Sequence, residues 1–114
     1  MNAMTLKNGG LKPIFEAIED EIIRATRKFP SNKHMLPALN EEVGELNKAM
    51  MELDIERYIE FHKLGNETTI EKLITMNQEV FDEAMQVACM AIRIMIEGDA
   101  NFSYQPIHQI GPIK

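Results

Sequence analysis

The sequence predicts an all-α fold, a bundle of three main helices whose second and third members run antiparallel and which oligomerisation completes. Hydrophobic residues make up 45% of the chain, yet only 6% of it is aromatic and it has no Trp. A core of Leu, Ile, Met, Val and Ala suits helices better than sheets. The apolar residues also recur at helical spacing, and Pro and Gly gather between these segments.

The first helix is expected to begin near Pro13, because proline is favoured at the first position of a helix. It should run through Phe29 and stop at Pro30. Its apolar face repeats every three or four residues. The members of that face are Ile14, Phe15, Ile18, Ile22 and Ala25.

The second helix should begin between His34 and Leu36 and end near Gly65, a residue that commonly terminates helices. One face carries Leu39, Val43, Leu46, Met50 and Leu53. After Asp54 the apolar stripe moves to another side of the helix, with Ile55, Tyr58 and Ile59. This change of phase indicates a kink, a break, or a helix shared between two partners.

The third and longest helix is expected from about Thr68 to Glu97, with Thr68 or Thr69 as its N-cap and Gly98 as its stop. From residue 84 to residue 96 it is apolar on nearly all sides, which places it centrally or at an interface. Residues 1–11 read as a loose N-terminus and residues 99–114 as an extended tail. We therefore expect one domain, residues 1–114.

Charge and cysteine content exclude several classes of function. The formal charge of −6 argues against binding to a nucleic acid polymer, which needs a basic surface. Cys89 is the only cysteine, so an intrachain disulfide is impossible and a Cys/His zinc site is disfavoured. The sequence contains neither an apolar run of membrane-spanning length nor a signal-peptide pattern, and these features predict a cytoplasmic protein with no membrane partner.

Two acidic motifs stand out. The first is Glu41-Glu42-Val43-Gly44-Glu45 and the second is Glu79-Val80-Phe81-Asp82. In each motif the outer acids (Glu42 with Glu45, Glu79 with Asp82) are three residues apart, which places both on one face of a helix. Two such pairs on facing helices would gather four carboxylates. A divalent cation would relieve their mutual repulsion.

Positions on the helical wheel support a site at these motifs. Glu42 falls inside the apolar arc of its helix, between Leu46 and Ala49, where surface glutamates are uncommon. Gly44 costs about 1 kcal/mol relative to Ala within a helix, which indicates close approach of another backbone or a ligand. Arg93 shares a polar stripe with Glu79 and Asp82 and is therefore a candidate phosphate contact. The competing interpretation is a solvent-exposed face in which Lys48 and Arg93 form salt bridges with these acids.

The two motifs resemble the EExxE…ExxD signature of the MazG-like, all-α nucleoside triphosphate pyrophosphatase superfamily. The stretch from Glu41 to Ala49 is similar to the first motif helix of that family, and the stretch from Glu79 to Ile94 is similar to the second. The resemblance covers about residues 34–99. The gap between the motifs, residues 46–78, is somewhat longer than family members usually show.

This resemblance implies a homodimer or homotetramer that binds Mg²⁺, with Mn²⁺ as the alternative. It further implies hydrolysis of a nucleoside triphosphate to the monophosphate and pyrophosphate, with water attacking the α-phosphorus. Glu42, Glu45, Glu79 and Asp82 would then be the metal ligands. Glu41, the candidate catalytic group, would either hold the ligands from outside the coordination sphere or orient the water. Lys48 and Arg93 are candidates for holding the departing pyrophosphate.

Two other functions compete with the pyrophosphohydrolase. One is a non-catalytic helical oligomerisation or interaction protein with an acidic face. The other is a carboxylate-bridged di-iron bundle, which requires Glu-x-x-His pairs on two helices. The chain has no such pair, so we rank the di-iron bundle below the other two.

Overall fold

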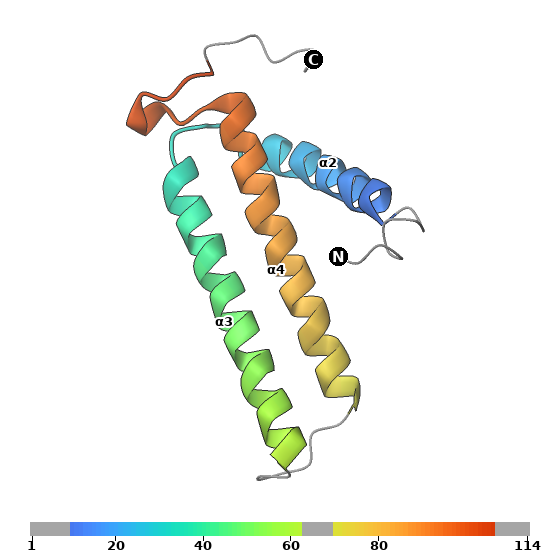
Figure 1. The fold of residues 1–114 in the computed structure, drawn as a ribbon. Helices are drawn as coiled ribbons and strands as arrows, with labels where there is room; N and C mark the ends of the chain where they lie inside the picture. Colours follow the sequence, from blue (N-terminus) through green and yellow to red (C-terminus); the bar gives the residue numbers. More distant parts are fainter. Residues whose placement is uncertain (1–9, 63–69, 107–114) are drawn as a thin grey trace. The chain divides into compact units, whose positions relative to one another are not determined.

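The computed structural model describes residues 10–62 and 70–106, and these form helices almost throughout. The α-helices are α2 (Leu11–Lys28), α3 (Met35–His62) and α4 (Ile70–Glu97), and a short 3₁₀ helix, η1 (Ala100–Phe102), follows (Figure 1). Within the described ranges the only β-type pairing is an isolated bridge between Asp99 and Tyr104. The predicted all-α fold with three main helices is confirmed.

The helix bounds lie close to those expected from the sequence. α3 is one continuous helix of 28 residues that passes through Asp54, so the predicted change of phase does not break it. Beyond that point Ile55 is 55% exposed and Tyr58 is 58% exposed. The expected stop at Gly65 and the expected cap at Thr68 or Thr69 lie outside the described residues.

The chain divides into two compact units. One unit contains residues 36–87, that is, nearly all of α3 and the first part of α4. The other contains residues 1–35 and 88–114, with α2, the last part of α4 and η1. Each unit has its own internal contacts.

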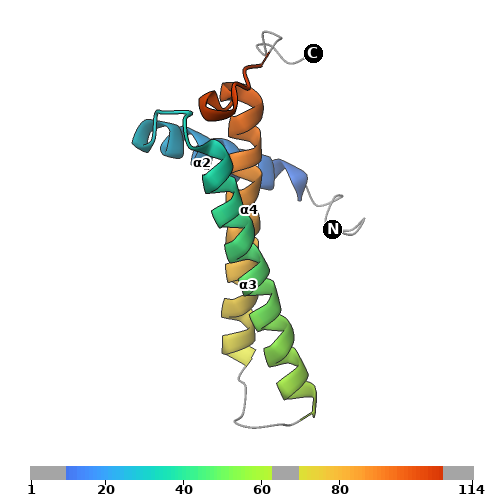
Figure 2. The same cartoon turned by 90° about the vertical axis from the view of Figure 1, so that its left-hand side faces the viewer.

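In the unit of residues 36–87, α3 and α4 lie side by side and run antiparallel (Figures 1 and 2). Each helix turns one half-buried face towards the other, here called its inner face. Its members alternate at spacings of three and four residues, which is the pattern of paired helices. The inner face of α3 consists of Leu39, Glu42, Leu46, Ala49, Leu53 and Glu56, and that of α4 consists of Leu73, Met76, Val80, Glu83 and Val87.

In the other unit, α2 packs on the last part of α4. Ile18 is 8% exposed and Cys89 is 2% exposed, and the Cys89 Sγ lies 3.8 Å from the Ile18 carbonyl oxygen. The Arg93 guanidinium donates to both carboxylate oxygens of Glu97, at 2.6 and 3.0 Å, and to the Phe29 carbonyl oxygen at 2.9 Å. These bonds connect the end of α2 to the end of α4.

Gly98 ends α4, as the sequence predicted. Its φ of +77° is left-handed, and a Cβ there would collide with the Tyr104 carbonyl oxygen. The chain then forms η1 instead of an extended tail, because the Asp99 side chain accepts a hydrogen bond from the Asn101 N–H at 3.0 Å and caps the turn. Residues 107–114 of the expected tail lie outside the described residues.

None of the helices in the described part of the chain combines the length and the apolar character that crossing a membrane requires.

Candidate metal centre

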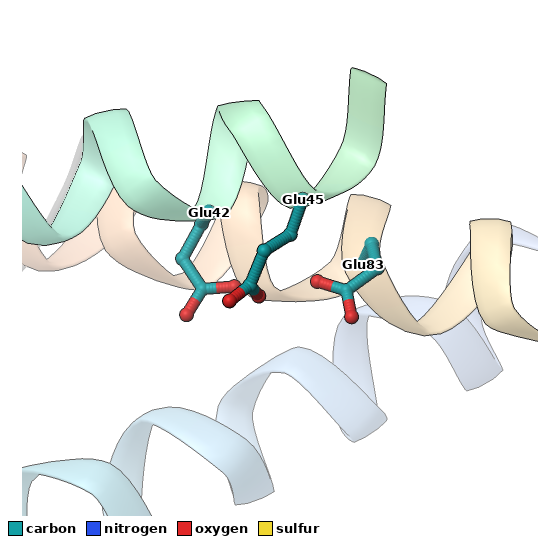
Figure 3. A group of neighbouring side chains, drawn as sticks. All are labelled: Glu42, Glu45 and Glu83. Atoms are coloured by element: carbon teal, nitrogen blue, oxygen red, sulfur yellow. The ribbon is translucent and has the colours of Figure 1, made fainter. Parts of the chain in front are cut away.

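The inner faces of α3 and α4 each carry a glutamate among apolar residues. Glu42 of α3 is flanked along its face by Leu39 and Leu46, and Glu83 of α4 is flanked by Val80 and Val87. Glu45 lies at the edge of the same face of α3. Carboxylate oxygens of Glu42, Glu45 and Glu83 all lie within 4.8 Å of one another (Figure 3). We call these three residues the acidic cluster.

Two oxygens of the acidic cluster are buried without a partner. The Oε2 atoms of Glu42 and Glu83 are both inaccessible to solvent, and neither accepts a hydrogen bond. An ionised carboxylate that loses its water without gaining a donor or a cation is strongly destabilised. These two atoms therefore require either a proton or a cation.

The pKa values of Glu42 and Glu83 are both raised, which is consistent with their buried, unpartnered oxygens. Burial raises the pKa of Glu42 to about 7, and repulsion from Glu45 and Glu83 adds to the effect. The pKa of Glu83 is also raised, by burial first and then by its contact with Glu45. Both shifts show that the folded protein disfavours the fully ionised cluster when no cation is present.

Other acids of this helix pair have cations beside them. Glu56 lies on the inner face of α3 like Glu42, but Lys72 Nζ approaches its carboxylate to 3.0 Å. Lys48 Nζ lies 4.0 Å from Glu52. By contrast, the groups that shift the pKa of Glu42 are all carboxylates: Glu41, Glu45 and Glu83. The acidic cluster is therefore a local concentration of negative charge.

A surface groove of about 310 Å³ begins at the acidic cluster and continues along the hairpin. Glutamates from both helices and a single lysine line it. The lining residues are Glu45, Lys48, Ala49, Glu52, Glu79 and Glu83. A ligand in this groove could touch the acidic cluster and Lys48 together.

Two of the four predicted metal ligands lie in the acidic cluster, and the other two lie outside it. Glu42 and Glu45 belong to the acidic cluster, and Glu79 lines the adjoining groove. Asp82 is exposed and accepts a hydrogen bond from Gln78 Nε2 at 2.9 Å. Glu83, which the sequence motif does not include, occupies the position facing Glu42 and Glu45.

The spacing of the apolar residues explains the presence of Glu83. The inner face of α4 steps from Met76 to Val80, then three residues to Glu83, then four to Val87. Asp82 is one residue earlier and therefore lies about 100° around the helix. The apolar series of α4 is visible in the sequence and points to Glu83, whereas the acidic motif points to Asp82.

The other predicted site residues fall in different surroundings. Glu41 is exposed beside the acidic cluster, and Lys48, with its side chain 77% exposed, lines the groove. Arg93 belongs to the other unit, is 3% exposed and is paired with Glu97. A Cβ at Gly44 would meet no atom within 4 Å, so the described chain makes no close approach there.

No family model, curated protein or solved structure matches this chain. The interpretation of the acidic cluster therefore depends on its own chemistry and on the sequence motifs.

The donor set fits a hard divalent cation. Carboxylate oxygens are the ligands that Mg²⁺, Mn²⁺ and Ca²⁺ prefer, and the cluster contributes no thiolate or imidazole that would favour zinc. A bound cation would give the buried oxygens of Glu42 and Glu83 the partner that they lack. The residues present therefore fit a metal centre.

Proposed function

We propose that Glu42, Glu45 and Glu83 bind a divalent cation, and that the protein is a Mg²⁺-dependent nucleoside triphosphate pyrophosphohydrolase. The observation that carries the cation site is the pair of buried, unpartnered oxygens on Glu42 and Glu83. The resemblance of the two acidic motifs to the MazG-like signature supplies the reaction, which is cleavage to a nucleoside monophosphate and pyrophosphate.

The shape of the site is compatible with a triphosphate. Mg²⁺ keeps several waters and takes phosphate oxygens directly, and a site with three carboxylates leaves coordination positions for both. When bound, the cation would neutralise phosphate charge and lower the pKa of the water that attacks the α-phosphorus. The groove beside the acidic cluster is open and has room for the phosphate chain.

In this reaction, the charged residues around the acidic cluster would each have a different role. Lys48 lines the groove and its exposed ammonium can bind phosphate oxygens. Glu79 lines the same groove and can hold a water or a second cation. Glu41 stands next to the acidic cluster on α3 and can orient the attacking water. We assign Arg93 to packing, because Glu97 and Phe29 already engage its guanidinium.

A second candidate function is a non-catalytic helical oligomerisation protein. The observation that favours it is the large apolar surface of the unit of residues 36–87, where Phe61 is 80% exposed and Ile70 is 77% exposed. Under this function Glu42 is partly protonated near neutral pH, where its pKa lies, and Mg²⁺ has no effect on the protein.

A pyrophosphate-release assay tests the enzyme. Purified full-length chain is incubated with ribo- and deoxynucleoside triphosphates, with and without Mg²⁺, and pyrophosphate and orthophosphate are measured separately. We expect Mg²⁺-dependent pyrophosphate release that Glu83→Gln reduces by at least a hundredfold. Asp82→Asn is the matched control, because it removes an exposed charge from the neighbouring position, and it should reduce the rate less than tenfold.

Three outcomes count against the proposal. Orthophosphate release would exclude attack at the α-phosphorus. Equal losses in Glu83→Gln and Asp82→Asn would contradict the assignment of ligands. Absence of release with every nucleotide, together with no Mg²⁺-induced rise in melting temperature, would favour the oligomerisation protein.

A further inference from the structure

A pocket of about 490 Å³ lies beside the last turns of α3, within the unit of residues 36–87. Its apolar lining comes from three aromatic side chains of α3 and from the half-buried Leu73 of α4. The three aromatic residues are Tyr58, Phe61 and His62. Sites that bind small molecules are commonly about 300–1,000 Å³ in volume, so this pocket is large enough for one. We call it the aromatic pocket.

The three rings of the aromatic pocket are in contact. The centroid of the His62 ring is 4.2 Å from that of Tyr58 and 5.0 Å from that of Phe61. These contacts restrain the rings, yet Tyr58 stays 58% exposed and Phe61 80% exposed. Exposed aromatic faces that are held in place favour a planar ligand, because a second ring gains both apolar burial and stacking energy there.

Asp54 and Arg57 add a hydrogen-bond acceptor and a hydrogen-bond donor to the same pocket. They are three residues apart on α3, so their side chains are neighbours on the helix surface. Asn77 of α4 positions the guanidinium, because its Oδ1 accepts from Arg57 Nη2 at 3.3 Å while its Nδ2 donates to the Leu73 carbonyl oxygen at 2.8 Å. This bond uses one of the five N–H donors of a guanidinium and leaves others for a ligand.

We infer that the aromatic pocket binds the base of a guanine nucleotide. Guanine carries two N–H donor groups next to two acceptors, O6 and N7, along one side of its ring system. A carboxylate accepts hydrogen bonds from the donor pair, and a guanidinium donates two hydrogen bonds to O6 and N7. Because Asp54 and Arg57 are neighbours, one guanine can bind both of them while it stacks on Phe61.

Other planar ligands match the polar groups of the aromatic pocket less well. Adenine and cytosine each offer a single amino group to Asp54, where guanine offers two N–H donor groups. A cationic ring would bind Asp54 but would be repelled by Arg57. An anionic ring would be repelled by Asp54 and by Glu60, whose side chain also lines the pocket. Guanine is therefore the best match to the lining.

The aromatic pocket is separate from the acidic cluster. Arg57 follows Glu45 by 12 residues of α3, which is about 18 Å of helix. Only a ribose lies between the α-phosphate of a nucleotide and its base, so a nucleotide held at the acidic cluster by its α-phosphate does not reach this pocket. The inference therefore concerns a second binding site, and it does not depend on the proposed cation site or on the proposed reaction.

An NMR titration of the isotope-labelled full-length chain tests the inference, in EDTA so that the acidic cluster holds no cation. The probes are the 5′-monophosphates of guanosine, inosine and adenosine, which share the same phosphate. Inosine differs from guanosine only by the loss of the 2-amino group. We expect shifted resonances at residues of the aromatic pocket. Guanosine monophosphate should bind about threefold more tightly than inosine monophosphate and about tenfold more tightly than adenosine monophosphate.

Two variants separate stacking from recognition of the base edge. Phe61→Leu should weaken the binding of all three nucleotides about fivefold or more, because it removes the most exposed ring. Asp54→Asn should abolish the preference for guanosine monophosphate over inosine monophosphate. The matched controls are Phe81→Leu and Asp82→Asn, which change exposed residues of α4 outside the pocket and should leave both properties unaltered. Circular dichroism would verify that the four variants fold.

Three results would overturn the inference. The first is the absence of shifted resonances at the pocket with any of the three nucleotides at about 20 mM, well above the dissociation constants that stacking and one bidentate contact should give. The second is equal affinity for the three nucleotides, which would exclude recognition by Asp54 and Arg57. The third is an equal loss of affinity in Phe61→Leu and Phe81→Leu, which would place the bound base elsewhere.

Discussion

Glu42 of α3 and Glu83 of α4 face each other across the helix pair, and each has one buried carboxylate oxygen that accepts no hydrogen bond. Both stand at positions of the inner faces where their neighbours are Leu or Val. Two like charges at such positions oppose the packing of the helices. This arrangement of Glu42 and Glu83 therefore weakens the fold in the absence of a cation.

Removing one of the two charges should stabilise the metal-free protein. Glu42→Gln keeps the shape of the side chain and adds an amide that can donate to the Glu83 carboxylate. We expect a rise of a few degrees in the melting temperature in EDTA, corresponding to about 1 kcal/mol. The same variant should lose the Mg²⁺-induced rise in melting temperature, because it removes one of the three proposed ligands.

Glu71→Gln is the matched control for that measurement. It removes one negative charge from an exposed glutamate in the first turn of α4, away from the acidic cluster. It should lower the metal-free stability by a few tenths of a kcal/mol or leave it unchanged, and the response to Mg²⁺ should remain. Equal behaviour of the two variants would show that overall charge, and not the acidic cluster, controls stability.

The stability of the metal-free protein should fall as pH rises from 4.5 to about 7. The pKa of Glu42 in the folded state is about 7, above its ordinary 4.5, so the folded protein keeps a proton that the unfolded chain has lost. The stability contributed by this proton is fully present below pH 4.5 and is lost as pH rises through 7. Its size is on the order of 1–2 kcal/mol, after solvent screening of the half-buried carboxyl.

Chemical denaturation in EDTA at a series of pH values measures this dependence. Glu42→Gln should remove most of the slope between pH 5 and 7, since no proton is then taken up at that position. Saturating Mg²⁺ should also flatten or reverse the slope, because the cation binds the ionised carboxylates. A slope that is unchanged in the variant would assign the titration to a group outside the acidic cluster.

The sequence was sufficient for the fold class because the helices are regular and their ends carry strong signals. Pro13 lies in the first turn of α2, and Gly98 adopts the left-handed conformation that ends α4. η1 could not be foreseen, because it depends on the local hydrogen bond from the Asn101 N–H to the Asp99 side chain. One capping residue is too weak a sequence signal to predict a turn of three residues.

The site was predicted in part. Glu42 was identified because it interrupts an apolar stripe, and the structure places it on the inner face of α3 as expected. On α4 the motif led to Glu79 and Asp82, although the apolar series of that helix includes Glu83. Arg93 was expected to contact phosphate, but in the structure its guanidinium binds Glu97 and the Phe29 carbonyl oxygen. Only the fold brings Phe29 next to Arg93.

Gly98→Ala should destabilise the protein. The left-handed φ of +77° is unfavourable for an L-residue, and the added Cβ would collide with the backbone oxygen of Tyr104. We expect a loss of about 1–3 kcal/mol, seen as a lower denaturation midpoint with an unchanged slope. Gly44→Ala is the control, because a Cβ has open space there, and it should stabilise α3 by up to about 1 kcal/mol.

Substitutions should show that Arg93 has a packing role and that Lys48 has a ligand-binding role. Arg93→Lys loses the two-pronged bond to Glu97 at a position that is 3% exposed, so we expect a loss of about 1–3 kcal/mol in stability. Lys48→Met should alter stability by less than about 0.5 kcal/mol, because the ion pair of Lys48 with Glu52 is exposed and 4.0 Å long. If Lys48 holds the pyrophosphate, this variant should instead raise the KM for the nucleoside triphosphate severalfold. Normal melting of Arg93→Lys combined with loss of nucleotide binding would reverse the two assignments.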